Sequence, residues 1–135
     1  MAKPPVLASL IWTEALRFDV NSARISTVVD GDSNAGASPV QMLVIALAGC
    51  MSADIVDIVR KGRHALTGFR AEITAERAPE PPTRVVSANL RFHLEGNVPP
   101  AAVERAIALS RDKYCSVWHS LRQDIQLTTA FDIIP

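Results

Sequence analysis

One stretch of the sequence predicts a helix that is apolar on every side, and this constrains the fold more than any other feature. Almost every residue from 42 to 51 is apolar or small, and charge returns only at Asp54. Ser38 and Pro39, just before this run, are a preferred helix cap and a preferred first helical residue. A helix that is apolar all round must be buried all round, and 135 residues offer little to cover it. We therefore expect a second copy of the chain to cover it, in a homodimer.

The same run is too short to predict a membrane span. A span needs about 20 apolar residues, whereas the dense apolar stretch here covers only residues 40–51. The apolar tract at residues 6–12 is followed at once by Glu14 and Arg17, without a small-residue cleavage site, so it does not predict a signal peptide. Lys plus Arg and Asp plus Glu both total 14, so no excess positive charge favours nucleic acid or an anionic membrane. We expect a cytoplasmic protein that binds neither.

Alternating apolar and polar residues predict strands on both sides of the apolar helix. We expect strands at residues 6–20, 23–29, 66–75, 84–94 and 124–134, an amphipathic helix at 100–111 and a short helix at 115–121. The strands come as hairpins and not as β-α-β units, which predicts an α+β fold with antiparallel sheet and two main helices. Residues 1–135 contain no linker or internal repeat, so we expect a single domain.

Two cysteines are the candidates for chemistry. Cys50 lies in the apolar helix, where a free cysteine usually packs as a small hydrophobic residue, and Asp54 one turn later would raise the pKa of its thiol. Cys115 precedes the short helix, whose N-terminus is expected to lower the pKa of that thiol, and His119 is one turn further on. The spacing of these four residues is not typical of a metal site, so we expect no metal and no cofactor. From the residues alone, the thiols are either inert core residues or a redox pair.

The contexts of the two cysteines carry a family resemblance. Residues 38–50 read SPVQMLVIALAGC, and residues 113–117 read KYCSV. Both resemble the cysteine motifs of the OsmC/Ohr family of osmotically induced and organic hydroperoxide resistance proteins, and the similarity extends over essentially the whole chain. The resemblance implies an intertwined homodimer that reduces organic hydroperoxides. It also implies that Cys50 is the peroxidatic thiol, that Cys115 resolves its sulfenic acid as a disulfide, and that a dithiol or lipoyl reductant restores both.

The start of the apolar helix departs from the family pattern. Family members carry a glutamate there and an N-terminal arginine that contacts the thiolate, whereas this sequence has Gln41, which forms hydrogen bonds but carries no charge to hold an arginine. Arg24 is the nearest match to the family arginine, and Arg17 is the second. The implied site is therefore Cys50, Cys115, Arg24 and Gln41. The alternative function is a weakly active or non-catalytic dimer that binds a small apolar or acyl ligand at its interface.

Overall fold

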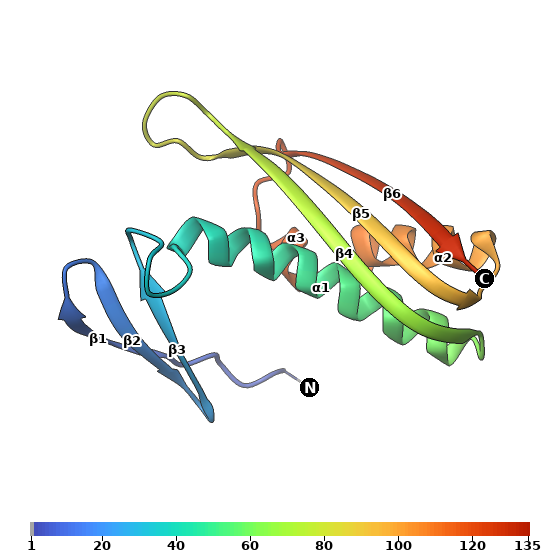
Figure 1. Cartoon of the computed structure of the whole chain (residues 1–135), viewed down its shortest axis with the longest axis horizontal. Helices are drawn as coiled ribbons and strands as arrows, with labels where there is room; N and C mark the ends of the chain where they lie inside the picture. The colour runs from blue at the N-terminus through green and yellow to red at the C-terminus, as the bar shows by residue number, and fades with distance from the viewer. Residues whose placement is uncertain (1) are drawn as a thin grey trace. The chain divides into compact units, whose positions relative to one another are not determined.

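The computed structural model describes residues 2–135. The chain divides into two compact units, and the boundary along the chain falls between Leu43 and Val44. In chain order the elements are β1 (Ser9–Glu14), β2 (Arg17–Ser22), β3 (Ile25–Asp30), α1 (Pro39–Lys61), β4 (Ala65–Arg77), β5 (Val85–Asn97), α2 (Pro100–Leu109), the π-helical turn η1 (Ser110–Tyr114), α3 (Ser116–His119) and β6 (Gln126–Ile134) (Figure 1). The α+β class is confirmed. The division falls inside α1, so a single domain over residues 1–135 stays a prediction.

The N-terminal unit is a three-stranded antiparallel sheet in the order β1-β2-β3. The expected single strand over residues 6–20 is wrong, because the chain reverses at Ala15 and Leu16 and pairs Trp12 with Phe18. Ala15 takes a positive φ of 47°, as a tight hairpin turn requires. Neither turn residue is a common turn former, so the local pattern of apolar and polar residues hides the reversal.

Most apolar side chains of this unit are exposed in the isolated chain. All six residues of β1 are exposed. The large apolar residues that face solvent in this unit are Val6, Leu7, Leu10, Ile11, Trp12, Leu16, Ile25 and Leu43. A small sheet needs a packed hydrophobic face for independent stability. The N-terminal unit therefore carries apolar surface that the described chain leaves uncovered.

Asp30 organises the loop between β3 and α1. Its side chain is 1% exposed and accepts backbone hydrogen bonds from Asp32, Asn34 and Ala35 at 2.8–3.2 Å. The guanidinium of Arg17 lies 3.4 Å from the same carboxylate. The N–H of Ala35 above all, then that of Asp32, lowers the pKa of the Asp30 carboxyl, and the charge of Arg17 adds to the effect. Arg17 therefore has a structural role within its own unit.

Helix α1 begins at Pro39, as the sequence predicts, with Ser38 as its cap. The Oγ of Ser38 accepts the backbone N–H of Gln41 at 3.1 Å. In return, the Oε1 of Gln41 accepts the backbone N–H of Ser38 at 2.8 Å and the hydroxyl of Ser33 at 2.5 Å. This reciprocal pair is a capping box, which satisfies two backbone donors at the start of the helix.

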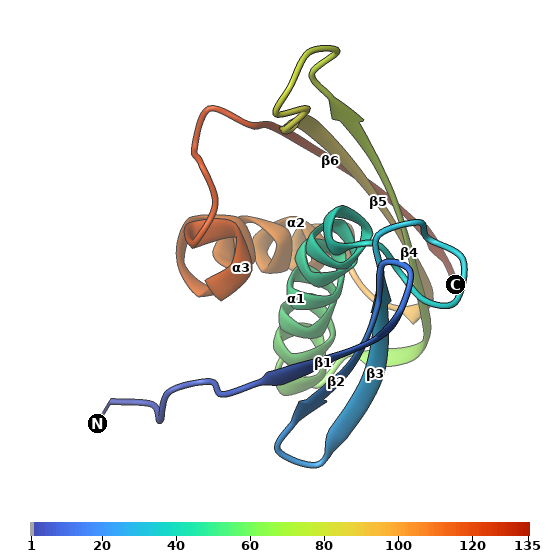
Figure 2. The ribbon, with the colours of Figure 1, turned by 90° about the vertical axis from the view of Figure 1, so that its left-hand side faces the viewer.

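The C-terminal unit contains a second three-stranded sheet, in the order β4-β5-β6. The long hairpin β4-β5 is antiparallel, as expected, but β6 runs parallel to β5, so the expectation of purely antiparallel sheet is wrong for this pair. The parallel pairing follows from the connection between β5 and β6. Along it, α2, η1 and α3 carry the chain back across one face of the sheet before β6 begins. Figure 2 shows these elements and α1 on the same side of the sheet.

The main core lies between that sheet face and the helices. It contains Ala88, Leu90, Phe92 and Leu94 of β5, Leu47, Met51, Ile55 and Val59 of α1, and Val103, Ala106 and Ile107 of α2. The α1 residues are four apart and form one stripe, while Ile45 on the same helix is 60% exposed. By length and mean hydropathy α1 would also pass for a membrane span, a test that core helices of folded proteins pass too. Its buried stripe favours the core-helix interpretation.

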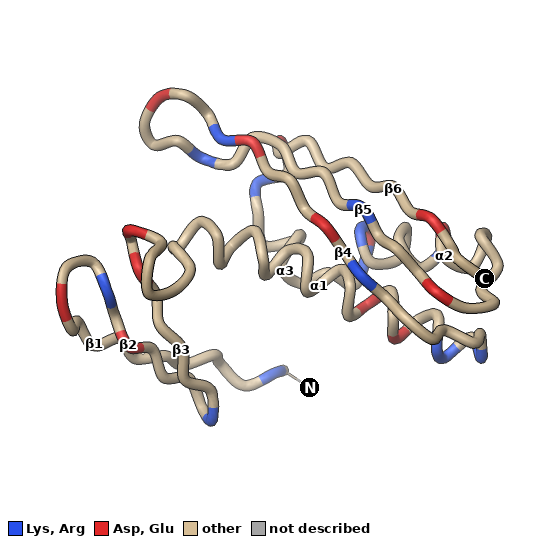
Figure 3. Tube along the Cα trace, in the orientation of Figure 1, with Lys and Arg blue, Asp and Glu red and all other residues tan. Residues whose placement is uncertain are grey.

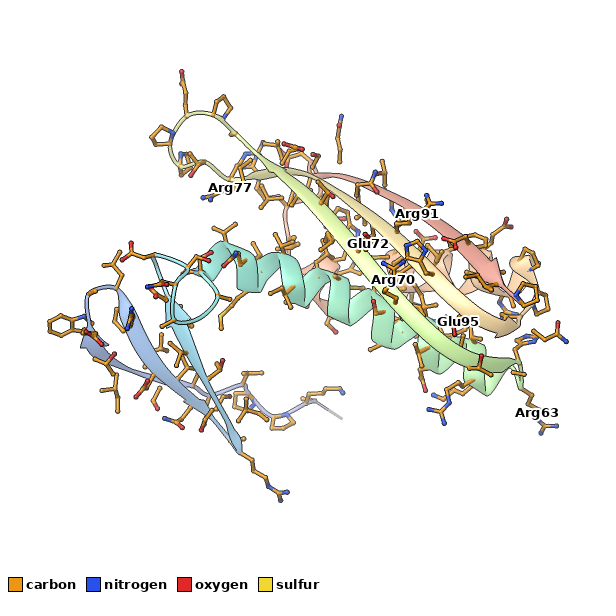
Figure 4. The ribbon with its side chains drawn as sticks, viewed as in Figure 1. Arg63, Arg70, Glu72, Arg77, Arg91 and Glu95 are labelled. Carbon is orange, nitrogen blue, oxygen red and sulfur yellow. The ribbon has the colours of Figure 1, made fainter. Side chains whose placement is uncertain are left out.

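The outer face of the sheet is polar. Charged residues follow one another along β4 and β5 (Figure 3), and Figure 4 shows Arg70 and Glu72 on β4 and Arg91 on the neighbouring strand. Glu72 lies 2.8 Å from Arg70 and 2.7 Å from the Nε2 of His93. The first pair lies within β4 and the second joins β4 to β5, and such pairs between charged or polar side chains are typical of a solvated sheet face. The apolar side of the sheet is therefore the one that faces α1 and α2.

Candidate active site

Two thiols and one carboxylate meet between α1 and the segment that follows α2. The Sγ atoms of Cys50 and Cys115 and a carboxylate oxygen of Asp54 all lie within 4.8 Å of one another. Cys50 and Asp54 share a face of α1 because they are one helical turn apart. Cys115 comes from the junction of η1 and α3, and both cysteines are free thiols. The structure thus brings together the two cysteines that the sequence singles out.

The π-helical turn η1 positions Cys115. Helix α2 ends at Leu109 instead of continuing to residue 111, and the backbone N–H of Cys115 reaches back to the carbonyl of Ser110 at 2.8 Å. Such wide turns occur frequently at functional sites. Cys115 itself is extended, and its Sγ accepts the backbone N–H of Trp118 at 3.3 Å as the cap of α3. The expected helix over residues 115–121 therefore shortens to Ser116–His119.

The Cys115 thiol holds its proton at neutral pH. Its side chain is 0% exposed, and burial raises its pKa from 9.0 to about 11. The Trp118 N–H pulls this pKa down, whereas the Cys50 thiol and the Asp54 carboxylate push it up. The expectation that the helix N-terminus lowers the pKa of Cys115 is therefore wrong. One backbone donor does not compensate for the loss of water around the sulfur.

Asp54 is fixed by a partner that the sequence analysis missed. The hydroxyl of Ser110, which is fully buried, donates a hydrogen bond of 2.8 Å to the Oδ2 of Asp54. Asp54 itself is half-buried. In the sequence, Ser110 looks like a small residue on the apolar face of an amphipathic helix, and only the π-helical turn gives it this contact. No local signal reveals it.

The other predicted site residues have different local surroundings. Arg24 is exposed in the turn between β2 and β3, and Arg17 is paired with Asp30. Gln41 is exposed in the first turn of α1, where its side chain completes the capping box. His119 is exposed at the end of α3. The roles of Arg24 and Gln41 in a reaction stay predictions.

The cluster allows two kinds of chemistry. Neighbouring free thiols can be oxidised to a disulfide and reduced again by exchange with another dithiol. Thiolates and carboxylates are also zinc ligands, so Cys50, Asp54 and Cys115 are the residues that could hold a metal. His119 is considered in the sequence analysis together with these three residues as a metal site, but it is not part of the cluster. Dithiol chemistry needs only the two sulfurs, and the expectation that the protein uses no metal stays a prediction.

Comparison with known proteins identifies the family of the chain. The model of the family described as "OsmC-like protein" matches residues 30–130. Protein YhfA of Escherichia coli K12 is 35% identical over 130 residues, which cover 94% of this chain and 97% of YhfA.

Solved structures agree on the fold. An OsmC-like protein from Mycoplasma pneumoniae superposes with a TM-score of 0.85 at 13% identity, over 99% of this chain and 100% of that one. An organic hydroperoxide resistance protein OsmC from Legionella pneumophila has a TM-score of 0.72 at 13% identity, over 98% and 99% of the two chains. The fold, the family match and the similarity to YhfA agree, and the chain belongs to the OsmC-like protein family.

Proposed function

We propose that this protein is a thiol peroxidase that reduces organic hydroperoxides. The observation that carries the proposal is the approach of the Cys50 and Cys115 sulfurs to within 4.8 Å. The fold is shared with organic hydroperoxide resistance proteins, which supports the same reaction class. Cys50 is partly exposed and Cys115 is not. We therefore assign the attack on the peroxide to Cys50 and the resolving step to Cys115.

The proposed reaction has three stages. The Cys50 thiolate attacks the terminal oxygen of the hydroperoxide, and an S–O bond forms as the O–O bond breaks. Cys50 becomes a sulfenic acid, and the alkoxide takes up a proton and leaves as an alcohol. Cys115 then displaces water from that sulfur and forms a disulfide. A dithiol reductant such as a dihydrolipoyl group restores both thiols. We place this cycle in the cytoplasm, where the reducing conditions keep resting thiols free.

We also propose that the working unit is a homodimer. The exposed residues Leu43 and Ile45 of α1 support it, and so do the uncovered apolar residues of the N-terminal sheet, because exposed apolar surface of this extent marks an interface. Light scattering coupled to gel filtration should give about twice the 14.6 kDa of one chain. Ile45→Asp should shift the mass toward that of one chain, while Glu104→Lys on the exposed side of α2 should not. A wild-type protein that elutes as a monomer would contradict the dimer.

A consumption assay tests the peroxidase directly. Wild type, Cys50→Ser and Cys115→Ser would receive cumene or tert-butyl hydroperoxide, with dihydrolipoamide or dithiothreitol as the reductant. We expect turnover in wild type and none above background in Cys50→Ser. Without reductant, Cys115→Ser should consume one equivalent and then hold a sulfenic acid that dimedone traps. If wild type consumes neither hydroperoxide faster than Cys50→Ser does, the peroxidase proposal is wrong for these substrates.

A second candidate is a dimer that binds a small apolar or acyl ligand with little or no catalysis. Gln41 favours it, because the neutral side chain is engaged in the capping box and offers no charge to organise an arginine near Cys50. A fluorescent fatty acid such as cis-parinaric acid separates the two functions. Saturable binding together with no hydroperoxide turnover would favour the binding protein, whereas turnover that depends on Cys50 would favour the enzyme.

A further inference from the structure

The resolving step requires the Cys115 thiol to lose its proton. A thiol attacks as its thiolate, whereas the Cys115 side chain is 0% exposed and its burial raises the pKa of the thiol, so the protonated form prevails at pH 7. The same burial that raises this pKa keeps bulk water and soluble bases away from the sulfur. A second step of useful speed therefore needs a protein group that accepts the Cys115 proton during the attack.

Asp54 has the geometry for this task. Its carboxylate oxygen lies within 4.8 Å of both sulfurs, a separation that one bridging water can span. The Ser110 hydroxyl holds the other side of the carboxylate at 2.8 Å, so its orientation is fixed. Three groups act on the Cys115 sulfur: Cys50 and Asp54 from α1, and the backbone N–H of Trp118 from α3. Of these, the carboxylate is the natural base.

We propose that Asp54 carries the proton of the resolving step, accepting it from Cys115 and delivering it to the group that leaves Cys50. This inference rests on the proposed peroxidase function. The S–S bond between Cys115 and Cys50 forms as the S–O bond of the sulfenic acid breaks. The thiol proton passes through the Asp54 carboxylate to the departing hydroxide, which leaves as water. The step regenerates the Asp54 carboxylate, and the electron pair of the new bond comes from Cys115.

A purely electrostatic role for Asp54 predicts the opposite result. The negative charge of Asp54 raises the pKa of Cys115, so removing that charge would increase the thiolate fraction and speed the resolving step. A proton carrier predicts that the step slows, because general-base assistance is typically worth about 10²–10⁴ in rate. The sign of the change therefore decides between the two roles.

The experiment measures the resolving step without peroxide. One equivalent of 4,4′-dithiodipyridine, in buffer with EDTA, forms a mixed disulfide on Cys50 and releases one thiopyridone. Attack by Cys115 then releases a second one, at a rate independent of reagent concentration and absent in Cys115→Ser. We expect Asp54→Asn to slow this second release roughly 10- to 100-fold at pH 7, and less at pH 9.5, where a larger fraction of Cys115 is already ionised before the attack. Asp57→Asn is the matched control, because Asp57 is exposed on the same helix and pairs with Lys61 at 2.9 Å.

Two further variants separate the carrier from a structural role. Asp54→Glu restores a carboxylate and should recover part of the lost rate, and Ser110→Ala should slow the second release only a few-fold. If Asp54→Asn fails to fold, the pH profile of wild type decides instead. A second release that rises about tenfold per pH unit from pH 7 to pH 9 would follow the free thiolate of Cys115 and would overturn the proposal. An equal or faster second release in folded Asp54→Asn would overturn it as well.

A parallel peroxide experiment keeps the two proposals distinguishable. In Asp54→Asn, hydroperoxide should produce a Cys50 sulfenic acid that dimedone traps for longer than in wild type. If hydroperoxide fails to oxidise Cys50 in wild type, the peroxidase proposal falls, while the dipyridine measurement still decides the role of Asp54. A sulfenic acid with the same lifetime in both proteins would contradict the proton-carrier role and leave the peroxidase standing.

Discussion

The high pKa of the Cys115 thiol can be measured directly. We predict that this thiol titrates near pH 11, two units above its ordinary value of 9.0, because the folded protein withdraws it from water. At pH 9 an ordinary thiol is half ionised, whereas Cys115 should be only about 1% ionised. Cys50→Ser isolates the titration of Cys115. It also removes the smaller contribution of Cys50, so the midpoint in this variant should lie slightly lower.

The measurement is the ultraviolet absorbance of the thiolate near 240 nm as the pH rises from 7 to about 12. The blank is Cys50→Ser/Cys115→Ala, which retains Tyr114, the one tyrosine of the chain, and therefore the same phenolate signal. Circular dichroism at each pH confirms that the protein stays folded. A thiolate midpoint at or below pH 9 in the folded protein would refute the reasoning, because it would mean that the Trp118 N–H outweighs burial.

Three further outcomes are expected. Because the folded pKa of Cys115 is raised, its contribution to stability is present below about pH 9 and is lost as the pH rises through 11. Between pH 9 and pH 11 the free energy of unfolding, measured with urea, should fall by about 2 kcal/mol more in wild type than in Cys115→Ala. Ile55→Ala should cost about 2–5 kcal/mol in urea unfolding because Ile55 is 0% exposed, whereas Glu104→Gln on the surface should change stability by less than about 0.5 kcal/mol. Ser38→Ala should cost about 1 kcal/mol through the lost cap, and a calorimetric midpoint equal to that of wild type would contradict the capping box.

The sequence predicts the features of this fold that depend on neighbours along the chain. Ser38 and Pro39 mark the start of α1 because capping and proline placement are local effects. The hairpin β4-β5 follows from alternation of apolar and polar residues on both sides of a proline-rich loop. The motifs around Cys50 and Cys115 identify the family, and the structure brings the two thiols together.

The features that escape prediction depend on packing between distant segments. The parallel pairing of β6 becomes visible only once the connection through α2 is in place. The π-helical turn at Ser110 is likewise not encoded by a local pattern, and it decides both the burial of Cys115 and the partner of Asp54. The predicted direction of the Cys115 pKa shift is therefore wrong. The sequence indicates the nearby helix N-terminus, but it does not indicate how deeply the sulfur is buried.

The separation of Cys50 and Cys115 along the chain has a consequence for protein lifetime. About 65 residues lie between the two sulfurs that meet in the folded protein. A bond between them would close a loop of that length and restrict the unfolded chain, an effect worth about 4 kcal/mol in chain-entropy treatments. An oxidised molecule would therefore open less often than a reduced one and present fewer cleavage sites to proteases. Under the proposed peroxidase cycle, a cell exposed to hydroperoxides would therefore degrade the protein more slowly, before any new copy is synthesised.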